Sequence, residues 1–145
     1  MPEKETLKRA KEDKEEGKAP STQAGEFVRE EIEHVREGKH GARSAKQAIA
    51  IGLSKARRAG VKLKPPKKAS KETRKQAARD LKKGKKKTAK KSAKRSRASS
   101  RVLKREGSSA ASQRALSRHA RKAAKKRSAA SRSRSAKKAA RTRKK

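Results

Sequence analysis

Apolar residues recur at helical spacing in only one stretch of the chain, residues 25–63. The first half of this stretch predicts a helix from about residue 22 to residue 37, because its apolar side chains fall on one face at 100° per residue. These side chains are Ala24, Phe27, Val28, Ile32 and Val35. Ser21 or Thr22 is placed to cap the start of this helix, and Gly38 is placed to end it.

The opposite face of this first helix carries a row of glutamates, Glu26, Glu30, Glu33 and Glu37. Two interpretations stay open: the row is a solvated face, or it is an intramolecular counterion for cations later in the chain. Glu31 departs from the pattern because it falls within the apolar arc. Either Glu31 lies at the rim and pairs with a base of the following helix, or the packing face is narrower than drawn.

A second helix is predicted from about residue 44 to residue 59. Ser44 followed by Gln47 is a capping-box pattern, and Gly60 followed by Val61 matches a Schellman end. Small residues surround Gly52 at the centre of the inner face, which would let the first helix approach closely. The two helices and the turn between them therefore predict a helical hairpin.

The core of this hairpin would be small. It consists of Phe27, Val28, Ile32, Val35, Ile49 and Leu53, closed by Val61 and Leu63. A two-helix unit of this size is marginal alone, so we expect either a homodimer formed through the hairpin or a third element to complete it.

The flanks of the hairpin lack such periodicity. Residues 1–21 alternate Lys and Glu, and we expect a disordered leader in which Gly17 and Pro20 end any transient helix. Residues 65–145 are rich in Ala, Lys, Arg and Ser, and repulsion between like charges at i,i+4 opposes helix formation in the free chain. The predicted fold class is thus all-α: a two-helix hairpin domain over residues 22–64, with a largely disordered or conditionally helical basic tail.

Charge then points to the partner. The net charge is +36, and residues 65–145 hold 34 Lys and Arg against three acidic residues. The N-terminus has no apolar core typical of a signal peptide, no stretch is apolar enough to span a membrane, and there is no Cys. We expect a cytoplasmic, nucleoid-associated protein that binds a polyanion.

The kind of polyanion follows from the aromatic content. One Phe and no Tyr or Trp leave no platform on which unpaired bases could stack. We therefore predict histone-like, sequence-tolerant binding of duplex DNA through phosphate contacts, without a cofactor. An RNA- or ribosome-associated accessory protein is the alternative, and a hairpin that binds a protein partner is a third.

The predicted nucleic-acid-binding residues are cations of the second helix, the segment after it and the tail. They are Arg43, Lys46, Arg57, Arg58, Lys62, Lys64, Lys85, Lys86, Lys87, Lys90, Lys91, Arg95, Arg97, Arg118, Arg121, Lys125, Lys126, Arg132, Arg134, Lys137, Lys138, Arg141 and Arg143.

Catalytic and metal-binding residues are not predicted. The three histidines, His34, His40 and His119, lack further ligands at metal-binding spacing, so we expect no metal site. The sequence also shows no nucleophile paired with a base and no glycine-rich phosphate loop, so we expect no enzyme.

The stretch EFVREEIEHVREGKHGARSAKQAIAIGLSKARRAGVKL, residues 26–63, resembles a family of small, very basic bacterial and phage proteins that carry a domain of unknown function. The portion SAKQAIAIGLSKARRAG carries most of the resemblance. The tail is similar to the Ala/Lys-rich tails of linker histones. The resemblance implies a bacterial source and an association with DNA, and it implies no site residues.

Overall fold

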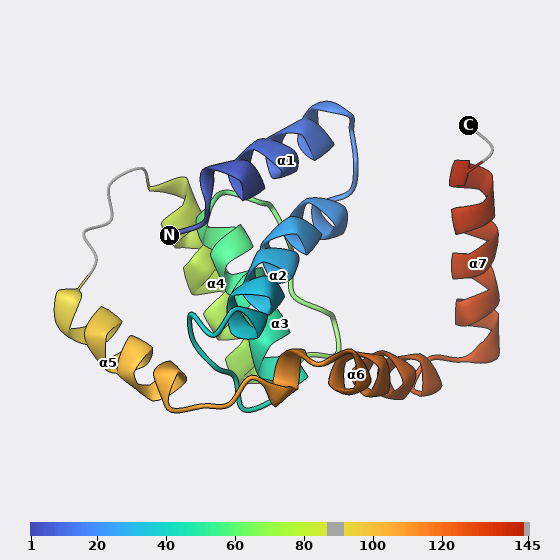
Figure 1. Ribbon diagram of the computed structural model, residues 1–145. Coiled ribbons are helices and arrows are strands. Elements are labelled where there is room, and N and C mark those ends of the chain that lie inside the picture. The colour runs from blue at the N-terminus through green and yellow to red at the C-terminus, as the bar shows by residue number, and fades with distance from the viewer. Residues whose placement is uncertain (87–91, 144–145) are drawn as a thin grey trace.

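The computed structural model describes residues 1–86 and 92–143, and these residues are helical without any strand (Figure 1). The elements in order are α1 Lys4–Glu15, α2 Pro20–Arg36, α3 Ala45–Arg58, α4 Lys71–Lys85, α5 Ala93–Lys104, the 3₁₀ turn η1 Ser109–Ala111, α6 Gln113–Lys125 and α7 Ala129–Arg143. The all-α class is confirmed. The prediction of a two-helix hairpin with a disordered tail is wrong, because α1 precedes the hairpin and four further α-helices follow it.

Both hairpin helices form close to their predicted bounds, and their ends follow from local chemistry. Ser44 accepts a hydrogen bond from the backbone N–H of Gln47 at 3.2 Å, while the Gln47 side chain accepts one from the N–H of Arg43 at 2.7 Å. At the other end of α3, Gly60 has φ +101° and the N–H of Val61 donates to the carbonyl of Ala56 at 3.1 Å, as in a Schellman end.

The start of α2 differs from the prediction. Its N-cap is Ala19, and Pro20 occupies the first helical position, where a residue without an N–H costs no hydrogen bond. Pro20 therefore begins a helix, whereas the sequence predicted that it would end one. Ser21 and Thr22 lie inside the first turn.

Gly52 sets the distance between α2 and α3. A Cβ atom placed on Gly52 would lie 2.6 Å from the Cα of Val28 and 3.0 Å from the carbonyl oxygen of Phe27. Contacts that short do not occur, so only glycine permits α2 to lie this close. The predicted close approach is confirmed, and it is a contact of backbone on backbone.

The helix α1 packs on α2 although it has no apolar stripe. Its buried residues are Thr6, Ala10 and Asp13, which share one face at spacings of four and three residues. Small side chains let the helix come close, and an ion pair between Arg9 Nε and Glu26 Oε2 at 2.9 Å joins the two helices. The prediction of a disordered leader is therefore wrong: residues 4–15 are helical and docked.

The helix α4 covers the other side of α3. Ala77 and Asp80 are its buried residues, and Asp80 accepts a 2.6 Å hydrogen bond from the Ser54 hydroxyl of α3. Gly84 makes the approach close, because a Cβ there would lie 2.2 Å from the carbonyl oxygen of Arg57. The first part of the predicted tail is therefore a structural element of the domain.

A second part of the predicted tail closes the turn between α2 and α3. The N–H of Gly41 donates to the carbonyl of Leu103 at 2.8 Å, and the N–H of Ala42 donates to that of Gly107 at 3.0 Å. Next to this junction, Ala110 and Ala111 of η1 are buried against the hairpin. Residues more than sixty positions apart thus complete one core.

The core consequently falls into two clusters. The first holds Phe27 and Val61 with three alanines, and the second holds Val35 with four alanines, two of them from η1. Ile32, Leu53 and Leu63 are half-buried and pack against these clusters, in agreement with the predicted core. Elements outside the hairpin complete the core, which is one of the two predicted solutions.

Serine side chains start the four described α-helices that follow the hairpin. Ser70, Ser92, Ser112 and Ser128 each accept a hydrogen bond from a backbone N–H three residues later. The helix α6 leaves the bundle beside α3, and α7 stands apart from the bundle (Figure 1). None of the helices in the described ranges is long and apolar enough to cross a membrane.

Candidate nucleic-acid interface

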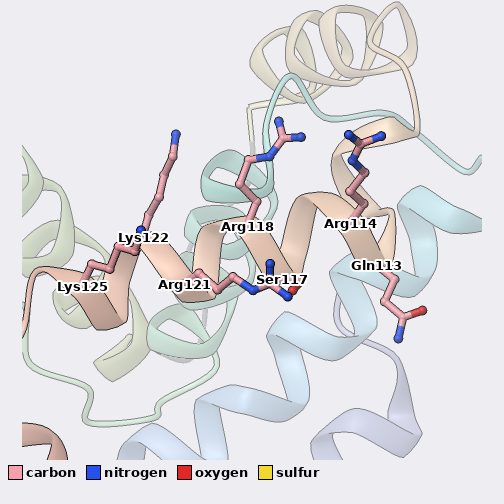
Figure 2. Close-up of a pocket in the computed structure, with 7 residues that line it drawn as sticks. All are labelled: Gln113, Arg114, Ser117, Arg118, Arg121, Lys122 and Lys125. Carbon is pink, nitrogen blue, oxygen red and sulfur yellow. The ribbon is translucent and has the colours of Figure 1, made fainter.

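The helix α6 presents an exposed cationic face. Arg114, Arg118 and Lys122 are four residues apart, and Figure 2 shows them projecting to one side of the helix. Arg121 and Lys125 lie next to them, and the five cations extend along about 16 Å of the helix axis. A hollow of about 720 Å³ runs along these residues, together with Gln113 and Ser117.

No ion pair to this face occurs in the part of the chain that the structure describes, and the local sequence explains why. Residues 92–143 contain 19 Lys and Arg and a single acidic residue, Glu106. The cations of α6 therefore lack protein counterions among the described residues.

The other predicted cations lie on several elements and do not form one patch. Arg43 and Lys46 flank the start of α3, Lys62 and Lys64 follow its end, and Lys85 and Lys86 end α4. Arg95 and Arg97 lie on α5, Lys126 caps α6, and Arg132, Arg134, Lys137, Lys138, Arg141 and Arg143 lie on α7. All of these side chains are exposed. Lys87, Lys90 and Lys91 lie outside the described residues.

Two arginines at the end of α3 differ from this description. Arg57 is 8% exposed and its Nε donates to the carbonyl of Leu63 at 2.9 Å, which fixes the segment after the helix. Burial lowers the pKa of this guanidinium. Arg57, a predicted nucleic-acid-binding residue, is thus buried and bonded within the protein. Arg58 is exposed, but its Nε lies 3.7 Å from Asp80, so part of its charge is neutralised within the protein.

Sequence reasoning missed two members of the α6 face, Arg114 and Lys122. A signal for them existed, because a helix that starts after Ser112 brings positions 114, 118 and 122 onto one face.

In the described residues, the glutamates of the α2 row pair with cations before residue 65. In the described ion pairs, Glu26 contacts Arg9, Glu33 contacts Arg29 at 3.1 Å and Glu37 contacts Lys39 at 3.0 Å. No cation after residue 64 takes part in these pairs. The structure thus offers no support for the interpretation of the row as a counterion for the tail.

Two glutamates of α2 are buried, and one lysine of α3 contacts both. Glu30 is 2% exposed and Glu31 is 1% exposed, and Lys55 Nζ lies 3.5 Å from Glu30 Oε1 and 2.6 Å from Glu31 Oε2. Glu31 pairs with a base of the second helix, as one of the two interpretations predicted. The pair lies in the interior and not at the rim. Glu30 was placed in the outer row, and that placement is wrong.

Two histidines extend this buried polar group. His40 Nε2 lies 3.0 Å from Glu31 Oε1, and His34 Nε2 lies 2.9 Å from the carboxylate of Glu3. Hydrogen bonds from His34 and Lys39 lower the pKa of Glu3, and the carboxylates of Glu37 and Glu3 raise the pKa of Lys39.

The sequence shows no further ligands at metal-binding spacing from the histidines, but the fold brings one glutamate and two histidines together. Each of Glu31, His34 and His40 offers one potential ligand atom, and these three atoms lie within 4.8 Å of one another. The turn after α2 reverses the chain and returns His40 to the helix, a placement that sequence spacing does not reveal.

Comparison with known proteins reaches only the hairpin region. Searches of the curated proteins and of the solved structures found no match. The predicted resemblance to a family whose domain has an unknown function is confirmed: residues 11–68, which hold α2, α3 and the turn between them, match the model of a family of unknown function, DUF6496.

Proposed function

We propose that this protein binds duplex DNA through the phosphate backbone, in a sequence-tolerant, histone-like manner and without catalysis. The observation that carries the proposal is the exposed cationic face of α6, which has five Lys or Arg side chains and no ion-paired acid among the described contacts. Such a face gains free energy from nucleic acid mainly by releasing counterions from the phosphates.

The shape of α6 suits a duplex. An α-helix with its side chains is about 10–12 Å across, and the major groove of B-form DNA is about 12 Å wide. A-form RNA has a deep and narrow major groove that does not admit a helix in this way. Cations on more than one side of α6 could contact the phosphates of both groove walls.

The chemistry of α6 favours backbone contacts over base reading. Gln113 is its only Asn or Gln, so few amide side chains are available for the paired hydrogen bonds that identify adenine. Arginine and lysine contact phosphates of any sequence. The expected specificity is therefore low, as for a protein of the bacterial nucleoid.

We expect that neutralising three cations of α6 weakens DNA binding by roughly 10-fold or more at moderate salt. The variant is Arg118→Gln/Arg121→Gln/Lys125→Gln, and fluorescence anisotropy over a salt series measures the affinity for a short labelled duplex. Each lost phosphate contact makes the slope of log K against log salt shallower by about 0.9, so the expected change is about 2.7.

The matched control removes the same number of charges from α1. In Lys8→Gln/Lys11→Gln/Lys14→Gln, two of the lysines already face Glu12 and Glu15 at 3.9 Å and 3.6 Å. The control should keep nearly the wild-type affinity and slope. Equal losses in both variants would show that only net charge matters and would reject α6 as the interface. Tighter binding of structured RNA than of duplex DNA at physiological salt would favour the RNA alternative.

A further inference from the structure

We infer that Glu31, His34 and His40 form a binding site for a divalent transition-metal ion, with Zn²⁺ as the best-matched ion. The three side chains converge from helix α2 and from the turn that follows it. The inference is independent of DNA binding, because none of the three residues belongs to the α6 face.

The ligand set suits zinc. Two imidazole nitrogens and a carboxylate oxygen are ligands that zinc accepts, usually with a fourth position for water or another oxygen. In a tetrahedral site with bonds of about 2.0–2.2 Å, neighbouring ligand atoms lie about 3.3 Å apart. His40 Nε2 and Glu31 Oε1 are already 3.0 Å apart, and all three atoms lie within 4.8 Å of each other. Small side-chain rotations would suffice to close the site around an ion.

The contacts of His40 orient its Nε2 toward Glu31. Its Nδ1 lies 3.0 Å from the carbonyl oxygen of Gly41, and its Nε2 faces the Glu31 carboxylate. Donation from Nδ1–H to the Gly41 carbonyl would hold the ring in this orientation. A metal ion bound between Nε2 and the carboxylate would take the place of a proton there.

The hydrogen bonds around the two histidines resemble those that orient the ligands of metal sites. A ligand histidine usually donates its second N–H to a backbone carbonyl or a carboxylate, which orients the ring. Gly41 supplies the carbonyl for His40, and Glu3 supplies a carboxylate 2.9 Å from His34. Lys55 pairs with Oε2 of Glu31, and Oε1 of the same carboxylate faces His40.

The position of the site explains what an ion would do. His40 lies in the turn between α2 and α3, whose backbone is bonded to the end of α5, and Glu3 lies directly before α1. An ion held by α2 and the turn would therefore link α2 with the segments next to α5 and α1. It would do so in a core built largely from alanine. Small domains with little apolar burial often gain stability from such an ion.

The test uses the full chain without a polyhistidine tag, first treated with a chelator and then freed of it. Titration of Zn²⁺ in competition with a chromophoric chelator should show one ion per chain, and thermal unfolding followed by circular dichroism should shift upward by several degrees with Zn²⁺. Mg²⁺ and Ca²⁺ should give no shift, because these ions prefer shells of oxygen ligands. Co²⁺ should produce visible absorption bands typical of a low-symmetry site.

The variants then assign the site. His40→Gln and His34→Gln should each lower the Zn²⁺ affinity at least 10-fold, and Glu3→Gln should lower it about 10-fold through the orientation of His34. His119→Gln is the matched control and should bind as the wild type does. Circular dichroism of each variant at low temperature checks that its helices are formed, and Glu3→Gln leaves all three ligands in place. Absence of saturable binding, or equal binding by His40→Gln and His119→Gln, would overturn the inference.

Discussion

Replacing Lys55 with methionine should destabilise the protein by about 3–5 kcal/mol, the largest effect that we expect from a single substitution. Lys55 Nζ is the cation nearest to two carboxylates that are almost fully removed from solvent, at 3.5 Å from Glu30 and 2.6 Å from Glu31. Without the lysine, the described contacts would leave Glu30 with the backbone N–H of Glu3 at 3.1 Å and Glu31 with His40 at 3.0 Å. The free energy of unfolding of such a domain is only about 5–15 kcal/mol, so much of it would be lost.

The measurement is urea-induced unfolding followed by circular dichroism, with a chelator present so that metal ions do not contribute. Lys46→Met is the matched control, because Lys46 is an exposed residue on the same helix. The control should stay within about 0.5 kcal/mol of the wild type. A triple variant, Lys55→Met/Glu30→Gln/Glu31→Gln, should recover part of the loss, since it removes the unpaired charges along with the lysine.

One further outcome decides the interpretation. Equal stability of Lys55→Met and Lys46→Met at neutral pH would contradict the burial of Glu30 and Glu31 described above. It would mean that water reaches both carboxylates.

The features that the sequence predicted correctly are those that depend on neighbouring residues. The ends of α3 follow from Ser44, Gln47 and Gly60, and each of these acts within one helical turn of the end that it forms. The hairpin core also followed from local periodicity, because Phe27 and Val35 repeat at helical spacing. Capping and periodicity are properties of a short stretch, so the sequence alone contains them.

The features that the sequence did not predict depend on contacts between distant residues. Residues 1–21 have no stripe of large aliphatic side chains, yet α1 docks through Thr6, Ala10 and Asp13. Close packing of small residues and an ion pair with Glu26 take the place of such a stripe. In the same way, alanines of η1 that looked like low-complexity sequence fill the core beside Val35.

The two candidate sites differ in the same way, because one follows from local spacing and the other from contacts between distant residues. Helical spacing would have been enough to place Arg114 and Lys122 beside Arg118. The approach of His40 to Glu31, in contrast, requires the turn after α2 to fold back. That turn is held by backbone hydrogen bonds from Gly41 and Ala42 to residues more than sixty positions later. No spacing rule within residues 31–40 contains this information.

The close contact at Gly52 leads to the second large prediction, in which one substitution has opposite effects at two positions. Gly52→Ala should destabilise the protein by about 1–3 kcal/mol, because its Cβ would lie 2.6 Å from the Cα of Val28 and α2 would have to move away. Gly25→Ala, within α2, places its Cβ where no atom lies within 4 Å. It should stabilise the protein by about 0.5–1 kcal/mol, the usual gain for alanine over glycine inside a helix.

Because the two substitutions are chemically identical, helix propensity favours alanine at both positions, and only the packing differs. Urea unfolding of the two variants measures the difference directly, and the gap between them isolates the contact of α2 with α3. Gly52→Val should cost more still, since its two γ-carbons would enlarge the overlap with Val28. If Gly52→Ala instead stabilised the protein as much as Gly25→Ala, the helices would have to lie farther apart than described. Glycine at position 52 would then only lower the stability of α3, as glycine does inside a helix.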